Sequence, residues 1–181
     1  MSQYYFFVAS LPTLSLTGDR RPTLTAFLAG CREHLSDHDL RTVESLDLAA
    51  PHNAPSTPAL VRDWRAFEMG VRNELARQRG AELGIDAAEY LRQDAGRTYT
   101  DLFGVADVVR DVRSIDSPLA AEEALDRVRW SRLDELETGH YFDTERVLVY
   151  YLKLQLLERR SAFDRTAGEE RFDGLTEQIV N

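Results

Sequence analysis

The stretch VLVYYLKLQLL, residues 147–157, decides the fold class of this chain. Within it only Lys153 and Gln155 are polar, and Asp143 stands upstream as a helix cap. A helix that is apolar nearly all round is buried in a core or in an interface. The run is shorter than the roughly 18 apolar residues that a membrane span needs. The sequence therefore predicts a helix over about 144–164 that packs against other helices or other chains.

Two further long helices carry clear start signals. Thr57-Pro58 and Ser117-Pro118 each place a capping residue before a proline at the first helical position. They predict helices over about 58–82 and 118–138, each with an apolar face. The apolar residues of the three long helices predict the core, which consists of Trp64, Phe67, Val71, Leu75, Leu125, Val128, Leu148, Leu152 and Leu156.

Shorter elements complete the pattern. Residues 2–11 are apolar and aromatic and fit either a strand or a first helical turn. Shorter helices are expected over about 23–35, from Ser36 onward with Asp39 in capping-box position, and over 86–92, 100–113 and 169–180. The sequence thus predicts an all-α fold, a helical bundle of about five to seven helices with short connections.

The length of 181 residues fits one domain, residues 1–181. The stretch LAAPHNAPSTP, residues 48–58, holds three prolines and is the one clear linker. It would join a minor lobe, residues 1–57, to a main bundle over 58–181. A chain of this size can bury enough surface to fold without a disulfide, and Cys31 is its single cysteine.

The charge of the chain narrows its partners. The 22 basic and 31 acidic residues give a net charge of −9, and neither half of the chain is net basic. Proteins that bind nucleic acid or anionic lipid usually present a basic face. No Lys or Arg precedes the short apolar run of MSQYYFFVASLP, so no secretory signal is expected. We therefore expect a cytoplasmic protein that binds no nucleic acid and inserts into no membrane.

Two lines of cations recur every seven residues on the expected long helices. The first comprises Arg65, Arg72 and Arg79, with Arg62 nearby, and the second comprises Arg146, Lys153 and Arg160. Each line is either a solvated face balanced by acidic neighbours or a contact surface for an acidic partner helix. We take these seven residues as candidate partner-binding residues.

Arg129 and Arg132 differ, because both fall inside the apolar arc of the helix over 118–138. A partly buried arginine needs a carboxylate or carbonyl partner. Asp134 and Glu135 lie on another side of the same helix, so we expect the carboxylate to come from a neighbouring helix or another chain. We group His140 with Arg129 and Arg132 as a buried polar residue with a structural role.

Two histidine spacings invite a metal interpretation. His34 and His38 are four residues apart, but Ser36 is expected to break the helix between them. Glu137 and His140 form one Glu-x-x-His unit, whereas a di-iron bundle needs two. Known nucleotide-binding and nucleophile motifs are also missing from the sequence. We expect no catalytic residue, no metal and no cofactor. The alternative is a carboxylate–histidine metalloenzyme around Glu137 and His140.

Three stretches together resemble a known family: YYFFVASLPTL near the start, WRAFEMGVRNELARQRGAELG at 64–84, and SPLAAEEALDRVRWSRLDELETGHYFDTERVLVYYLKLQLLERRSAF at 117–163. The family is an uncharacterised bacterial one, a domain of unknown function. Its genes tend to lie among those of bacterial V-type (A/V-type) ATPases. It resembles, more distantly, the all-helical C/d subunit that caps the rotor ring.

The resemblance implies a non-catalytic component or an assembly factor of a V/A-type rotary ATPase. Such a protein would bind stalk or rotor subunits through helical surfaces, and would lie at the inner membrane only through that complex. The competing hypothesis is a stand-alone helical module that forms a homo-oligomer through the apolar helix at 147–157.

Overall fold

The computed structural model describes residues 4–18, 21–48, 58–94, 97–98 and 104–161, and the all-α prediction is confirmed. The helices are α1 (Tyr5–Ser10), α2 (Leu24–His34), α3 (Asp37–Glu44), α4 (Ala59–Leu83), α5 (Val105–Arg113), α6 (Pro118–Glu137) and α7 (Thr144–Ser161). A short 3₁₀ helix η1 (Ala87–Tyr90) and an antiparallel pair β1 (Gln93–Asp94) and β2 (Arg97–Thr98) follow α4.

The expected boundaries agree closely with those helices wherever the chain is described. Residues 5–10 of the ambiguous first stretch are helical. Most of the proline-rich linker, the start of the helix expected from residue 100, and the helix expected over 169–180 lie outside the described residues. Among the described residues, no helix combines the length and the apolar composition needed to cross a bilayer.

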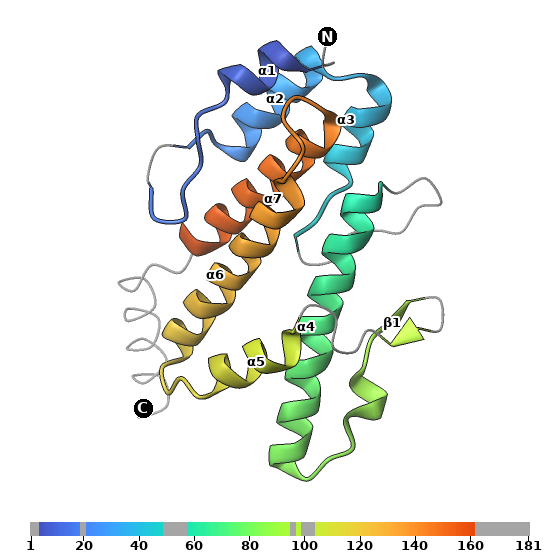
Figure 1. Ribbon diagram of the computed structural model, residues 1–181, viewed down its shortest axis with the longest axis vertical. Helices are drawn as coiled ribbons and strands as arrows, with labels where there is room; N and C mark the ends of the chain where they lie inside the picture. Colours follow the sequence, from blue (N-terminus) through green and yellow to red (C-terminus); the bar gives the residue numbers. More distant parts are fainter. Residues whose placement is uncertain (1–3, 19–20, 49–57, 95–96, 99–103, 162–181) are drawn as a thin grey trace, which may run out of the picture.

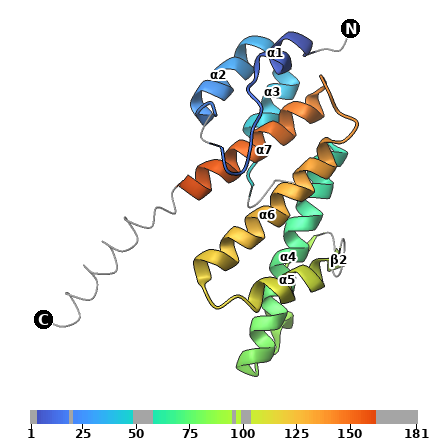
Figure 2. The same cartoon turned by 60° about the vertical axis from the view of Figure 1, so that its left-hand side comes forward.

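Helix α7 lies in the middle of the molecule (Figures 1 and 2). It packs against α2 and α3 on one side and against α6 on the other, while α4 packs against α5 and α6. All residues of the 147–157 stretch are buried except the half-buried Gln155. Other helices of the same chain therefore cover this helix. Its apolar surface is buried within one chain and is therefore not free to form the interface of a homo-oligomer, so self-association remains a prediction for other surfaces.

The core was largely predicted. Seven of the nine expected residues are buried, and Leu75 and Val128 are only partly buried against the cluster. The N-terminal segment contributes Tyr4, just before α1, together with Phe7 of α1 and Phe27 of α2 to the same cluster. Phe27 stacks on two tyrosines of α7, Tyr150 and Tyr151, with ring centroids 5.2 and 5.6 Å apart. Residues on both sides of the linker thus share one continuous hydrophobic cluster.

Side-chain caps begin several helices as the sequence predicts. Thr23, Ser36 and Ser117 each accept a hydrogen bond from the backbone N–H three residues later, and Asp143 does the same for Arg146. The capping box at Ser36 is altered, because its N–H donates to the Tyr4 hydroxyl at 3.3 Å. That hydroxyl in turn donates to the Asp39 carboxylate. The cap of α3 is thereby tied to the residue before α1.

Two hydrogen-bonded side chains hold the loops against the long helices. The buried Asn73 of α4 accepts from the Arg92 N–H at 2.8 Å and donates to the Arg92 carbonyl at 2.9 Å. Gln155 of α7 accepts from the Leu48 N–H at 2.7 Å and donates to the Leu46 carbonyl at 2.9 Å. Each amide satisfies backbone groups that no helix or strand pairs.

Two glycines of α4, Gly70 and Gly80, make a matched pair for testing how closely the segment after α4 approaches the end of that helix. A Cβ at Gly80 would lie 2.8 Å from the Ile85 carbonyl oxygen, whereas one at Gly70 would meet nothing nearer than Val105 Cγ2 at 3.8 Å. We expect Gly80→Ala to lower the free energy of unfolding by about 1–3 kcal/mol. Gly70→Ala should raise it by about 0.5–1 kcal/mol through helix propensity. Urea denaturation of both variants checks this, and a Gly80→Ala variant as stable as Gly70→Ala would contradict the close approach.

Candidate functional site

Charged side chains from three helices meet inside the bundle. Arg129 of α6 donates from Nε to Glu68 of α4 at 2.6 Å and from Nη1 to Asp126 at 3.1 Å. Arg159 of α7 also donates to Asp126. Glu68, Asp126 and Arg129 are buried. We call Glu68, Asp126, Arg129 and Arg159 the buried charge cluster.

The electrostatics of the cluster favour full ionisation of Arg129. Burial alone lowers the pKa of this guanidinium, but the carboxylates of Glu68, Asp126 and Glu122 outweigh burial and raise its pKa. The expectation that a neighbouring helix supplies the partner of Arg129 is confirmed by Glu68. For Arg132, the expectation that Glu135 of the same helix could not serve is wrong: Nη1 lies 2.7 Å from the Glu135 carboxylate, because residues three apart are neighbours on a helix.

A small cavity borders the buried charge cluster. Its volume is about 230 Å³, and its lining is rich in guanidinium groups; the lining residues are Asp47, Leu48, Glu68, Arg72, Arg129, Gln155 and Arg159. Arg72 is one of the lining residues, and its Nε lies 3.9 Å from the Glu68 carboxylate. About one third of the Arg72 and Arg159 side chains is exposed, so the cavity reaches solvent beside them.

The line of cations on α7 is not the exposed stripe that the spacing suggested. Lys153 is buried, and its Nζ lies 2.6 Å from Asp134 and also pairs with Glu137. Arg146 pairs with Glu137 as well. Arg160 lies 3.8 Å from Asp126. These three cations therefore join α7 to α6 within the chain, and we no longer take them as contact residues for a partner.

Burial shifts the pKa of the Lys153 ammonium group. Removal of its ammonium group from water lowers its pKa, although Asp134 opposes that shift. The ammonium also lies 5.2 Å from the ring centroid of Trp130, within reach of a cation–π interaction. A seven-residue spacing placed Lys153 correctly on one face of α7, but it could not reveal that α6 covers that face.

The line of arginines on α4 is divided between two environments. Arg62 and Arg79 are exposed, and Arg65 is half-buried. Arg72 turns toward Glu68 and the cavity. Arg62 and Arg79 thus remain the accessible members of the predicted contact surface, while Arg72 belongs to the interior wall.

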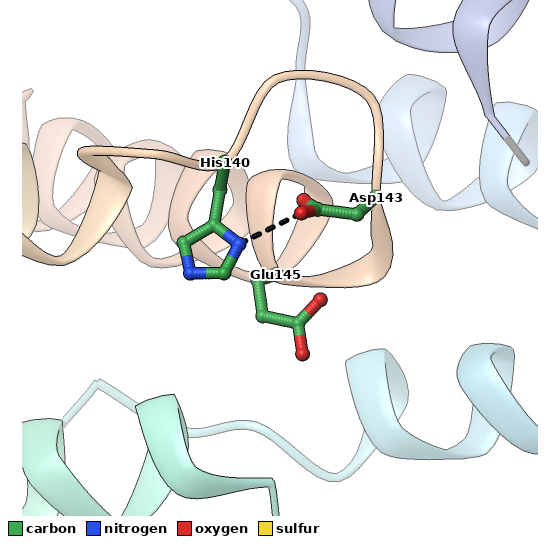
Figure 3. A group of neighbouring side chains, drawn as sticks. All are labelled: His140, Asp143 and Glu145. Atoms are coloured by element: carbon green, nitrogen blue, oxygen red, sulfur yellow. Dashed lines mark hydrogen bonds and ion pairs between the residues drawn. The ribbon is translucent and has the colours of Figure 1, made fainter. Parts of the chain in front are cut away.

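The loop between α6 and α7 and the first turn of α7 bring together His140, Asp143 and Glu145, whose candidate ligand atoms lie within 4.8 Å of one another (Figure 3). His140 Nδ1 lies 2.7 Å from Asp143 Oδ2, and Asp143 Oδ1 caps the Arg146 N–H at 3.0 Å. The carboxylate of Asp143 is thereby occupied in starting α7 and in fixing the imidazole. This arrangement accounts for His140 as a structural residue.

Neither predicted histidine pairing is brought together as a ligand set. The Glu137 carboxylate pairs with Lys153 and Arg146, and only its backbone carbonyl meets the His140 N–H, at 3.0 Å. His34 ends α2 and packs against the Phe7 ring, with centroids 5.2 Å apart. His38 follows the break at Ser36 on α3, as expected.

One surface was not predicted at all. Tyr5 of α1 lies beside the α6–α7 loop, where its ring contacts the Phe142 ring at a centroid distance of 4.6 Å, and the Phe6 ring lies 5.5 Å from the Tyr5 ring. The Tyr4 N–H donates to the Phe142 carbonyl at 3.1 Å. Phe6 is 82% exposed, Tyr141 is 72% exposed and Tyr5 is 50% exposed. We call Tyr5, Phe6 and Tyr141 the aromatic surface. The aromatic residues of this surface could be seen in the sequence as the YYFF and HYF runs. The sequence did not indicate that the two runs lie close together in the fold.

The fold and these sites define an all-α helical bundle with a buried ionic core and an exposed aromatic end. Residues 52–181 match the model of a family described as "Protein of unknown function (DUF2764)", and the chain belongs to this family. No curated protein and no solved structure shows significant similarity to the chain. The resemblance to an uncharacterised family is thus confirmed, and its association with a rotary ATPase remains a prediction.

Proposed function

We propose that this protein is a non-catalytic component or assembly factor of a bacterial V/A-type rotary ATPase. It binds helical stalk or rotor subunits through the aromatic surface. The observation that carries the proposal is the meeting of two of the three stretches on which the family resemblance rests. The run YYFF near the start and the run GHYFD near residue 140 are distant in sequence, and Tyr5 touches Phe142.

The chemistry of the aromatic surface supports protein binding. Single exposed apolar side chains are normal on soluble proteins, but adjacent ones mark interaction sites. Aromatic residues are enriched at the centres of protein interfaces, where few residues supply most of the binding free energy. The neighbouring loop is braced by the His140–Asp143 bond and the cap of α7, so Tyr141 is presented on an ordered support.

The arginines that remain accessible are secondary candidates. Arg62 and Arg79 of α4 are exposed and could contact acidic side chains of the same partner. Their contribution should weaken with salt, because exposed charges are screened beyond about 8–10 Å at physiological ionic strength. The protein would act in the cytoplasm and reach the inner membrane only through its partner subunits.

Affinity purification from the native host tests the proposal. The double variant Phe6→Ser/Tyr141→Ser removes most of the aromatic surface without touching the core. Tyr90→Ser is the matched control, since Tyr90 is a 66% exposed tyrosine on η1. We expect ATPase subunits to co-elute with the wild type and with Tyr90→Ser. The double variant should bind these subunits at least about tenfold more weakly, a change of about 1.4 kcal/mol in binding free energy, and should therefore recover far less of them.

Two outcomes would contradict the proposal. The first is that mass spectrometry finds no ATPase subunit with the wild-type chain at low salt and in mild detergent. The second is that the double variant retains the subunits fully. If light scattering instead shows a wild-type dimer that the double variant cannot form, the aromatic surface serves self-association and the rotary ATPase proposal loses its binding site.

A further inference from the structure

We propose that the cavity beside the buried charge cluster binds a phosphate-type oxyanion. The inference goes beyond the proposed function and depends on different residues. Its basis is that three arginines, Arg72, Arg129 and Arg159, line one space of about 230 Å³. Arginine forks match the oxygens of phosphate in pairs of parallel hydrogen bonds, and such charge-assisted bonds are among the strongest in proteins.

The first argument is the surplus of hydrogen-bond donors. Each guanidinium has five N–H donors, and within the described residues the three groups together make only the hydrogen bonds from Arg129 Nε to Glu68 and from Arg129 Nη1 and Arg159 Nη2 to Asp126. The Nε of Arg159 is buried and has no hydrogen-bond partner among the described atoms. Among the described residues, Arg72 contributes only an ion pair, to Glu68 at 3.9 Å. Buried donors of this kind require acceptors.

The second argument is that the carboxylates nearby are already engaged. Glu68 accepts from Arg129 and faces Arg72 with its other oxygen, and Asp126 is contacted by Arg129, Arg159 and Arg160. Asp47, the other carboxylate of the lining, is exposed and has a partner of its own. The partly exposed Glu122 lies 4.0 Å from both Arg129 and Arg159 at the edge of the cluster. An entering oxyanion would therefore meet N–H groups that these carboxylates leave unused.

The size of the cavity selects the ligand. Sites that enclose drug-sized ligands usually measure about 300–1,000 Å³, so this space suits a single phosphate group rather than a whole nucleotide. The exposed thirds of Arg72 and Arg159 mark the side from which a phosphate could enter. Free phosphate and a phosphate group carried on a larger molecule share this chemistry.

Isothermal titration calorimetry of the full chain with inorganic phosphate tests the site. We expect saturable binding of about one equivalent to the wild type at constant ionic strength. Arg72→Gln should weaken it by about tenfold or more, because one charge-assisted partner is lost. Arg72 is the suitable position because its only ion pair in the described chain is the long contact to Glu68, so its removal spares the bonds of Arg129.

Arg127→Gln is the matched control. Arg127 is an exposed arginine of α6 beside the cluster residue Asp126. The Arg127→Gln variant should bind phosphate with an affinity within about twofold of that of the wild type, a difference below about 0.5 kcal/mol.

Methyl phosphate distinguishes the two sources of the phosphate group. Equal affinity of the wild type for methyl phosphate and for inorganic phosphate indicates a phosphate group carried on a larger molecule, and weaker binding of methyl phosphate indicates free phosphate. Circular dichroism confirms that Arg72→Gln is folded. The proposal is overturned if the wild type binds no phosphate at millimolar concentration, or if Arg72→Gln binds it as tightly as the wild type. Because Phe6 and Tyr141 are unchanged in these variants, either proposal can fail without the other.

Discussion

The Arg129→Met variant should lose about 3–5 kcal/mol of its free energy of unfolding, because removal of Arg129 leaves two buried carboxylates with weaker compensation from partly exposed arginines. Glu68 would lose its 2.6 Å hydrogen bond and keep only the long contact to Arg72. Asp126 would retain Arg159, which is only partly buried. Urea denaturation followed by circular dichroism measures the change.

The control for this result is Arg127→Met. Arg127 is an exposed arginine on the same helix, and its replacement should change the free energy of unfolding by no more than about 0.5 kcal/mol. A triple variant in which Glu68, Asp126 and Arg129 all become apolar residues of similar volume should recover part of the loss, because no buried carboxylate then lacks a partner. If Arg129→Met is as stable as Arg127→Met, water reaches the cluster and it is not a buried ionic core.

The Trp64→Ala variant is expected to be destabilised by about 3–5 kcal/mol, the cost typical of large cavities in a core. Trp64 is fully buried on α4 and packs against Phe67 at a centroid distance of 5.6 Å. Its Nε1–H also donates to the Leu48 carbonyl at 3.4 Å and so joins α4 to the segment that follows α3.

Leu75→Ala provides the comparison, since Leu75 belongs to the same predicted apolar face but is only partly buried. The Leu75→Ala variant should lose clearly less free energy of unfolding than Trp64→Ala, because Leu75 removes less apolar area from water on folding. Far-UV circular dichroism during urea denaturation is the suitable measurement, since Trp64→Ala removes one of the two tryptophans. Equal losses at the two positions would mean that the helical periodicity, rather than the packing, sets the contribution of each residue.

The helices themselves were predictable because their signals are local. Ser117-Pro118 starts α6 and Asp143 caps α7 as expected, since a cap depends only on backbone groups within one turn. The buried face of α4 followed from spacing alone for Trp64, Phe67 and Val71. The short pair of β1 and β2 was missed, because two-residue strands carry no periodicity.

The charged residues show where local signals stop. The sequence by itself determined that Arg129 needed a carboxylate from a neighbouring helix or another chain, because a buried guanidinium without one is costly. Tertiary structure alone decided that Glu68 supplies it, and that Lys153, spaced like an exposed cation, is covered by α6. It also decided that Tyr5 and Phe142 meet, although 136 residues lie between them in the chain. The physical reason is that helix formation and capping depend on neighbours within one turn, whereas burial and ion pairing depend on which helix packs against which face.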